Sequence, residues 1–240
     1  MSGYVIQETD APSHSQPGDT VSMRTTIDAS SGAERLVQRV LRFASGRSRP
    51  RKAAGRDEVA YVVSGAGRLI LEGKPHELAE DTGVYIRAGE RYEIENTNAE
   101  DLVLISVTAP EPTEKDLTGA RRVTVRVADQ PSISAGKDRE FRLVIDPESG
   151  CRDVTQFVGW IPPGRAPTHH HLYDEVIYVL DGEGVLHLDG QSDTPISTGT
   201  CIHLPPPVRH CLENTGDRPL RVLGVFHPAG SAAEAYEDNQ

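Results

Sequence analysis

Apolar and polar positions alternate with a period of two along much of the chain, in short runs that glycine and proline separate. In EVIYVLDGEGVLHL, residues 175–188, two apolar runs flank the turn Asp-Gly-Glu-Gly. This pattern predicts a β-hairpin with glycine where a positive φ is needed. LVIDPESGCRDVTQFVGWIPPG, residues 143–164, predicts another pair of strands around a turn. The sequence thus favours many short strands over long helices.

The strand pattern occurs twice. DEVAYVVSGAGRLILEG, residues 57–73, aligns with DEVIYVLDGEGVLHLDG, residues 174–190, at ten identical positions of 17. Upstream, LVQRVLRFASG, residues 36–46, matches VTQFVGWIPPG, residues 154–164, in its pattern. The apolar spacing of residues 33–43 also suits a short helix, but their counterpart is flanked by proline, so we predict a strand. The chain contains two copies of about 110 residues each.

The repeat defines the expected domains. We predict an N-terminal arm, a first β-domain, a second β-domain and a polar tail, over residues 1–30, 31–115, 116–230 and 231–240. The arm is polar and rich in turn residues, so we expect it to be extended or partly disordered. TAPEPTEKDLTGARR, residues 108–122, is rich in proline and charge and is the expected connection between the two domains.

Composition supports the β-rich prediction and limits the classes of binding partner that we expect. The chain has 22 glycines, 17 prolines and 5% aromatic residues, and its net charge is −11. No basic stripe is present to follow phosphates, so we expect no nucleic-acid partner. No stretch approaches the roughly 20 apolar residues of a membrane span, so we expect no membrane partner. The three cysteines form no CxxC pair, which favours a reducing, cytoplasmic location.

The candidate chemistry lies in PTHHHLYDEVIY, residues 167–178. On a strand, His169 and His171 point to one face and His170 to the other, and Glu175 returns to the first face. His210, in LPPPVRHCLEN of the same copy, is a fourth candidate. A single histidine would more simply be satisfied by hydrogen bonds, but this spacing favours a metal site. Imidazoles with a carboxylate suit Mn, Fe, Co, Ni, Cu or Zn.

These residues resemble two motifs of the cupin superfamily. The first motif is matched by Gly164, His169, His171, Glu175 and Gly182, and the second by Gly199, Pro205, His210 and Asn214. The match departs in two ways: Pro207 replaces a glycine, and one residue is missing between Gly164 and His169. The resemblance implies an all-β bicupin, that is, two tandem antiparallel β-barrels of the double-stranded β-helix type. It also implies one divalent transition metal per chain, in the second barrel, with His169, His171, Glu175 and His210 as ligands.

The first copy departs from the metal motif. Glu58 is retained, but Lys52 and Ala54 replace the two histidines and Tyr92 takes the position of His210. These side chains cannot assemble a transition-metal site. We expect the first barrel to be a metal-free scaffold with a dimer surface, and Glu58 to pair with Lys52 or Arg56. The alternative is a small-molecule pocket. We expect the protein to form a homodimer.

Cupins include dioxygenases, decarboxylases, isomerases, hydrolases and binding proteins, so the resemblance leaves the reaction open. We predict an enzyme acting on a small oxygen-rich metabolite, first by dioxygenase-type oxidative cleavage, with Glu175 as a catalytic proton acceptor. The alternatives are an isomerase or hydrolase of a small keto or ureido acid, and a non-catalytic protein that binds or senses a metabolite. The other candidates for the substrate pocket are Gln156, Trp160, His187, His203 and Arg142.

Overall fold

The computed structural model describes residues 3–53, 55–110, 121–135 and 139–231. Strands dominate it, and the helical elements of these residues are four short 3-10 turns, η1 (Glu8–Asp10), η2 (Ala29–Ser31), η3 (Val127–Asp129) and η4 (Pro147–Ser149). Most of the expected connection at residues 108–122 and nearly all of the expected tail lie outside the described residues. No described helix is long and apolar enough to cross a membrane.

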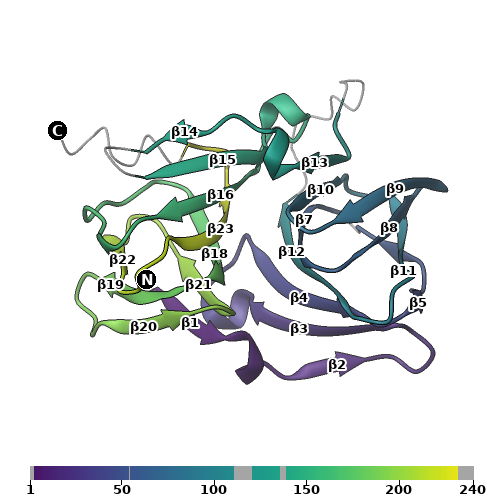
Figure 1. The fold of residues 1–240 in the computed structure, drawn as a ribbon, viewed down its shortest axis with the longest axis horizontal. Helices are drawn as coiled ribbons and strands as arrows, with labels where there is room; N and C mark the ends of the chain where they lie inside the picture. Colours follow the sequence, from purple (N-terminus) through teal and green to yellow (C-terminus); the bar gives the residue numbers. More distant parts are fainter. Residues whose placement is uncertain (1–2, 54, 111–120, 136–138, 232–240) are drawn as a thin grey trace.

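Each half of the molecule has a large and a small antiparallel sheet (Figure 1). The large sheet of the N-terminal half has the order β13 (Thr124–Arg126), β10 (Thr82–Ile86), β7 (Arg56–Ser64), β12 (Leu102–Pro110), β4 (Val37–Phe43), β3 (Val21–Ile27) and β2 (Ser13–Ser15). Its small sheet has the order β5 (Gly46–Arg47), β11 (Arg91–Asn96), β8 (Ala66–Leu71) and β9 (Lys74–Ala79), and β6 (Arg51–Lys52) also pairs with β11.

The C-terminal half repeats this arrangement. Its large sheet has the order β1 (Tyr4–Gln7), β21 (Thr200–Leu204), β18 (Asp174–Asp181), β23 (Leu220–His227), β16 (Thr155–Ile161), β15 (Glu140–Ile145) and β14 (Ile133–Ser134). Its small sheet has the order β17 (Gly164–Arg165), β22 (His210–Asn214), β19 (Glu183–Leu188) and β20 (Thr194–Ser197). We call the two-sheet units the N-terminal and the C-terminal barrel. In the described residues, no hydrogen-bonded ladder joins the two sheets of a barrel into one closed sheet.

The predicted all-β tandem fold is confirmed, and β4 is a strand as predicted. β15 and β16 pair around a turn, also as predicted. The predicted hairpin at residues 175–188 is wrong. β18 belongs to the large sheet and β19 to the small one, so the chain crosses between sheets at Gly182. Gly182 has φ +99° and lies against the backbone of Leu220, where a Cβ would be 3.2 Å from the Leu220 Cα. The turn chemistry was predicted correctly, but it serves a corner between sheets.

The two barrels exchange strands. β1 pairs with β21 of the C-terminal barrel, and β13, which begins the second copy, pairs with β10 of the N-terminal barrel. Residues 13–15 and 21–27 also form strands of the N-terminal sheet, so this sheet includes residues that precede the expected domain boundary at residue 31. Each copy of the repeat therefore starts with a strand that completes the sheet of the other copy.

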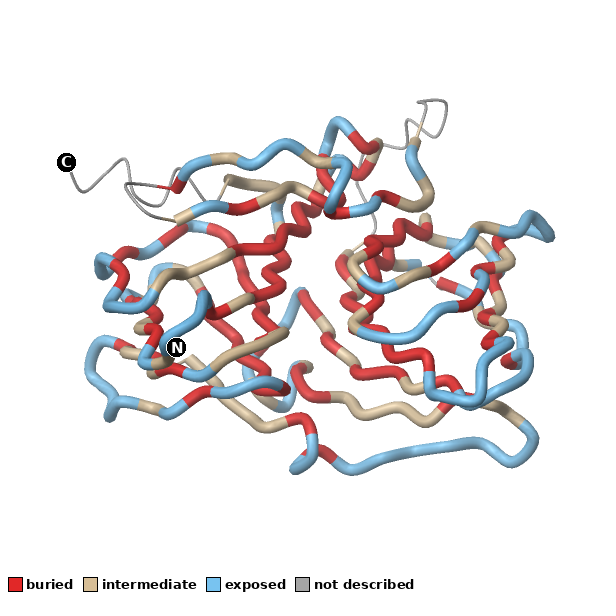
Figure 2. Tube along the Cα trace, viewed as in Figure 1, coloured by how far each residue is buried: buried red, intermediate tan, exposed pale blue. Residues whose placement is uncertain are grey.

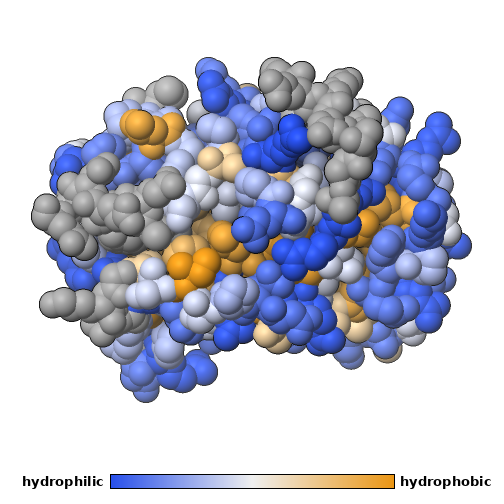
Figure 3. Space-filling model, turned by 90° about the horizontal axis from the view of Figure 1, so that it is seen from above, coloured by the Kyte–Doolittle hydropathy of each residue, from blue (hydrophilic) through white to orange (hydrophobic). Residues whose placement is uncertain are grey.

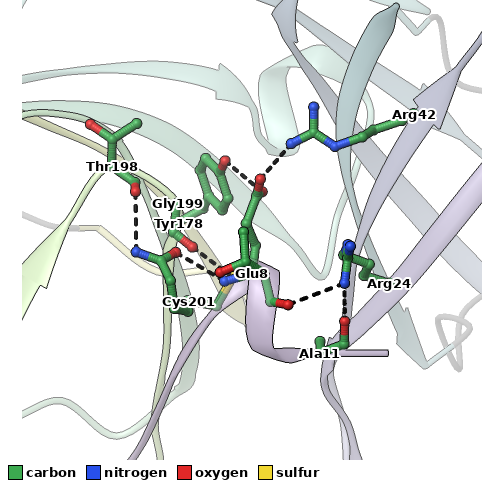
Figure 4. A network of polar contacts seen from close by, with 10 residues as sticks. Glu8, Ala11, Arg24, Arg42, Tyr178, Thr198, Gly199 and Cys201 are labelled. Atoms are coloured by element: carbon green, nitrogen blue, oxygen red, sulfur yellow. Dashed lines mark hydrogen bonds and ion pairs between the residues drawn. The ribbon is translucent and has the colours of Figure 1, made fainter. Parts of the chain in front are cut away.

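Two polar networks accompany this exchange. Near β1, Glu8 forms an ion pair with Arg42 and accepts a hydrogen bond from the Tyr178 hydroxyl at 2.9 Å (Figure 4). On the other side, Asp81 accepts from the Tyr61 hydroxyl at 2.5 Å and pairs with Arg221 at 2.9 Å. Each carboxylate thus joins a tyrosine of one barrel to an arginine of the other.

The large sheets of the two barrels pack face to face. Their shared apolar core contains residues of both halves, among them Val40, Val59 and Ile105 with Val158, Val176 and Val225. Two further apolar cores fill the barrel interiors. Buried segments accordingly lie between the halves and inside each barrel (Figure 2). Seen from above, the surface is largely hydrophilic, with hydrophobic residues in a band along its middle (Figure 3).

Candidate metal centre

Three histidines and one glutamate converge inside the C-terminal barrel. His169 and His171 lie in the loop between β17 and β18, Glu175 is the second residue of β18, and His210 begins β22. His169 and His210 form an isolated antiparallel bridge, with backbone N to O distances of 3.0 and 2.9 Å. This bridge fixes the loop against β22, so residues far apart in sequence face one cavity.

The side chains are close enough to share an ion. The ligand atoms of His171, Glu175 and His210 all lie within 4.8 Å of one another. His171 Nε2 is 2.7 Å from Glu175 Oε2. The rings of His169 and His210 are 4.4 Å apart between centroids. Two ligands about 2.0–2.2 Å from one metal are at most about 4.4 Å apart, so small side-chain movements would complete the set.

Backbone carbonyls orient all three imidazoles. The Nδ1 atoms of His169, His171 and His210 lie 3.1, 3.1 and 2.9 Å from the carbonyl oxygens of Pro167, Tyr173 and Val208. A carbonyl oxygen can only accept, so each Nδ1 carries a proton and Nε2 is the ring atom left to bind a metal. Histidine ligands of metals are typically held by such a hydrogen bond from the other ring nitrogen.

Burial favours the neutral form of two of the histidines. The four side chains belong to buried residues, with His210 only 3% exposed. Burial, together with the neighbouring His169 and His171, lowers the pKa of His210 to about 3. Burial also lowers the pKa of His169. Neutral imidazoles are the form that binds metal, so the residues present fit a transition-metal ion. His170, between two of them, is exposed.

The four side chains line a cavity of about 80 Å³. Its other walls are mostly aromatic and aliphatic, and they include Phe141, Phe157, Trp160, Tyr173, Leu212 and Phe226. The Tyr173 ring stacks on His171 at 4.3 Å and lies 4.2 Å from the Phe226 ring, which is 5.0 Å from Phe157. The cavity is far smaller than the roughly 300–1,000 Å³ of a pocket for a drug-sized ligand.

Of the five other pocket candidates, the structure places Trp160 at this cavity. The guanidinium carbons of Arg142 and Arg221 each lie 5.6 Å from its ring centroid. Arg142 does not line the cavity; it donates to the Val127 carbonyl at 3.2 Å. Arg142 therefore supports Trp160 from behind.

Gln156, His187 and His203 lie away from the cavity. Gln156 is on the face of β16 opposite Phe157, where a Cβ at Gly83 of the N-terminal barrel would lie 2.8 Å from its Oε1. His187 is on the outside of β19, 2.7 Å from Asp193 and 2.8 Å from Glu213. His203 is buried and lies 2.7 Å from Asp174 on the outer face of β18.

Apart from Trp160, the aromatic walls were missed in the sequence. For Tyr173 a signal existed, because it is two residues from both His171 and Glu175 and so shares their face under the period of two. Phe157 and Phe226 carried no such signal, since both faces of β16 and β23 are buried. Where both faces are apolar, alternation does not show which residues face a cavity.

In the N-terminal barrel, hydroxyl groups surround the retained carboxylate. Glu58 accepts hydrogen bonds from Tyr92 at 2.9 and 3.1 Å and from Ser106 at 2.5 Å. The expected ion pair of Glu58 with Lys52 or Arg56 does not occur among the described contacts. The position of the second lost histidine, residue 54, lies outside the described residues.

Comparisons with known proteins agree with this architecture. A family model described as a cupin domain matches residues 39–108 and 157–226. The chain is 39% identical over 68 residues to the oxalate-binding protein of Thermotoga maritima, covering 28% of this chain and 55% of that protein. It is 36% identical over 76 residues to acireductone dioxygenase of Sulfurihydrogenibium sp., covering 30% and 42%. The matches span about half the length of the curated relatives.

Among solved structures, a mutant of Bacillus subtilis oxalate decarboxylase superposes with a TM-score of 0.78. The superposition covers 96% of this chain and 79% of that one, at 14% identity. At this identity the likeness establishes the shared tandem fold alone.

Proposed function

The chain belongs to the cupin domain family, and from this premise we propose that it is a mononuclear metal-dependent enzyme that oxidatively cleaves a small molecule. The observation that carries the proposal is the position of the histidine–glutamate cluster, which lines a small, largely apolar cavity. The substrate would present two oxygen atoms to the metal and an apolar part to the walls. The class of compound is a small enol, catechol or 2-oxo acid.

His169, His171, Glu175 and His210 would hold the ion. A bound transition metal supplies Lewis acidity toward substrate oxygens and, if redox active, electrons for reaction with O2. The carbonyl-held imidazoles keep their Nε2 atoms directed to one point. Glu175 is the one carboxylate of the set, and its Oε2 would accept the proton that a substrate hydroxyl gives up on binding.

The cavity lining favours oxygen chemistry over hydrolysis. Apart from the cluster, the charged residues that line it are Arg139 and Glu140. The rings of Phe157, Tyr173 and Phe226 would exclude water and contact the apolar part of the substrate. Hydrolysis needs a positioned water, whereas O2 is apolar and enters such a cavity without a desolvation cost. The similarity to an acireductone dioxygenase supports the same reaction class.

A non-catalytic role is the second candidate. The relative from Thermotoga maritima is named for binding oxalate. In that case the same cluster and cavity would hold a metabolite through the metal without converting it. Both functions need the metal, so metal content does not distinguish them. Conversion of the bound compound to a product does.

The test combines metal analysis with oxygen uptake, on protein without a histidine tag. We expect about one transition-metal ion per chain, lost in His171→Ala and kept in His170→Ala, whose side chain is exposed. Metal-loaded protein should consume O2 with at least one small enol, catechol or 2-oxo acid, and His171→Ala should not.

Three results would count against the enzyme. Unchanged metal content in His171→Ala would refute the site. Saturable binding without oxygen uptake or product across the panel would favour the binding protein. Product release without oxygen uptake would replace oxidative cleavage with isomerisation or hydrolysis. Circular dichroism of both variants checks that the fold is kept.

A further inference from the structure

The N-terminal barrel contains a cavity of about 380 Å³ that is rich in positive charge. Arg39, Arg51, Lys52 and Arg56 line it, with Glu58 as the one carboxylate of the lining. The whole chain has a net charge of −11. A cationic cavity inside an acidic protein is a local feature that bulk composition does not explain.

The described residues neutralise little of this positive charge. The side chains of Arg39 and Lys52 make no hydrogen bond or ion pair with any described residue. Arg51 reaches Asp19 at 3.5 Å, a long contact. Arg56 donates to neutral oxygens, among them the Thr108 hydroxyl at 3.3 Å and the Thr108 carbonyl at 3.1 Å. Burial, and then the charge of Arg39, lowers the pKa of Arg56, as expected for cations held together.

The carboxylate in the cavity is already bound. Glu58 is buried and accepts hydrogen bonds from Tyr92 and Ser106, both neutral. It therefore offsets one of four positive charges and stays fixed by hydroxyl groups, and Asp19 offsets a second through Arg51, so two charges are left without a partner among the described residues. The remaining guanidinium and ammonium groups are available to another anion.

The strand pattern directs these charges inward. On β4, Arg39 alternates with Val40 and shares its face with Leu41 and Phe43, which pack in the core of the N-terminal barrel. Across the ladder, Arg39 is opposite Ser106, which also lines the cavity. Charges that face a barrel interior cost free energy unless an opposite charge compensates them. A bound anion would supply that compensation.

We propose that the N-terminal barrel binds a small dicarboxylate. Guanidinium groups pair with carboxylates in a two-bond fork, and two carboxylates would match the excess of positive charge. Protein phosphate sites commonly use the backbone N–H groups of a helix N-terminus. The described lining of this cavity consists of strand and loop side chains without such a helix, which favours a dicarboxylate over phosphate.

The test is calorimetric titration of the full-length protein with malonate and succinate at low ionic strength. It uses the wild type and His171→Ala, in which the cluster of the C-terminal barrel is disabled. We expect saturable binding of equal affinity in both. Arg39→Gln should weaken it at least tenfold, and Arg39→Lys, which keeps the charge but not the fork, should weaken it less. Arg126→Gln removes the same charge from an exposed site on β13 and should have no effect.

Several results would overturn the proposal. These are no binding, binding lost in His171→Ala but kept in Arg39→Gln, or an equal effect of Arg126→Gln. Inorganic phosphate binding as tightly as the dicarboxylates would overturn the assignment of the ligand class. Thermal unfolding checks that Arg39→Gln is folded, and Lys52→Gln, on the exposed edge of the cavity, provides a second variant with the same expected direction.

Discussion

The two barrels have matching strands but line their interiors with opposite chemistry. Strand register makes the comparison residue by residue. Arg39 faces Ser106 across β4 and β12, and Phe157 faces Gly224 across β16 and β23. A Cβ at Gly224 would collide with the Phe157 ring, so the large ring requires the glycine opposite it. At equivalent positions, the N-terminal barrel thus has an arginine opposite a serine, and the C-terminal barrel has a phenylalanine opposite a glycine.

The carboxylate stays while its surroundings change. Glu58 is opposite Thr108, and Glu175 is opposite Phe226. Around Glu58 there are hydroxyl and guanidinium groups; around Glu175 there are imidazoles and aromatic rings. The fold therefore fixes one inward carboxylate in each barrel, and its neighbours determine whether the cavity suits a metal ion or an anion.

Replacing Phe157 by the arginine of the equivalent position in the other barrel should have the largest effect on stability. Phe157 is buried, with 7% of its surface exposed. Phe157→Arg would place an unpaired cation among aromatic rings, which should lower the free energy of unfolding by about 3–5 kcal/mol and weaken metal binding through charge repulsion. Urea unfolding of chelator-treated protein measures the first effect and metal titration the second.

The reverse exchange is the control. Arg39 is only half-buried and lines a wide cavity, so Arg39→Phe should change the free energy of unfolding by no more than about 1 kcal/mol while abolishing binding of dicarboxylates. Equal destabilisation by both exchanges would contradict the difference that we infer between the interiors.

The second prediction concerns the pH dependence of stability, which should arise from the histidines of the C-terminal barrel. Below the ordinary histidine pKa of about 6.5, His169 and His210 become protonated in the unfolded chain. In the folded protein their lowered pKa values keep them neutral. Stability of the metal-free protein should therefore be fully present above that pH and fall as the pH drops toward about 3, the pKa of His210. The slope is up to about 1.4 kcal/mol per pH unit for each histidine.

Urea unfolding at several pH values with a chelator measures this slope. His210→Gln should reduce it by about the share of one histidine. Its counterpart Tyr92→Phe should keep the share of both histidines, because burial raises the pKa of Tyr92 well above its ordinary value and the tyrosine itself does not titrate in this range. A slope that is insensitive to His210→Gln would show that the buried imidazole is already protonated in the folded state.

The smallest expected effect concerns the exchanged strands. Glu8 follows β1 and bonds to Tyr178 and Arg42, while Val127 follows β13 and packs in the shared apolar core. Glu8→Gln should lower the free energy of unfolding by about 1.5–3 kcal/mol, the usual contribution of a hydrogen bond to a charged group. Asp10→Asn, at an exposed position two residues on, should not. Thermal unfolding of the two variants tests this, and equal melting temperatures would refute a role for Glu8.

Much of the fold could be predicted because the repeat is strong. The match of residues 57–73 with 174–190 indicated the duplication, and proline beside residues 154–161 indicated a strand for their counterpart. The exchange of strands was not predicted. Its signal is weak: Asp10, Pro12, Ser13 and Ser15 recur as Asp129, Pro131, Ser132 and Ser134, each following an edge strand. Nothing in a short polar motif identifies the sheet to which its strand belongs.

The convergence of His171, Glu175 and His210 could be predicted from the sequence, whereas the walls of the cavity, apart from Trp160, could not. The spacing of His169, His171 and Glu175 brought together residues that do converge, although the two histidines lie in a loop rather than on a strand. Gln156 was expected in the pocket, but it faces the other barrel. Both faces of β16 are buried, one against the cavity and one between the barrels, so its sequence carries no alternation from which to choose.

The pairing of Tyr4 with His203 also sets an order of events during synthesis. About 200 residues must leave the ribosome after β1 before its partner strand exists, which at ~5–20 residues per second takes roughly 10–40 s. β13, in contrast, emerges after β10 and finds its partner already made. The first strand to be translated is therefore among the last to be placed. Until β1 is placed, the outer edge of β21 has no partner strand. During this interval β1 of one nascent chain can pair with β21 of another chain on the same mRNA, which is a domain swap.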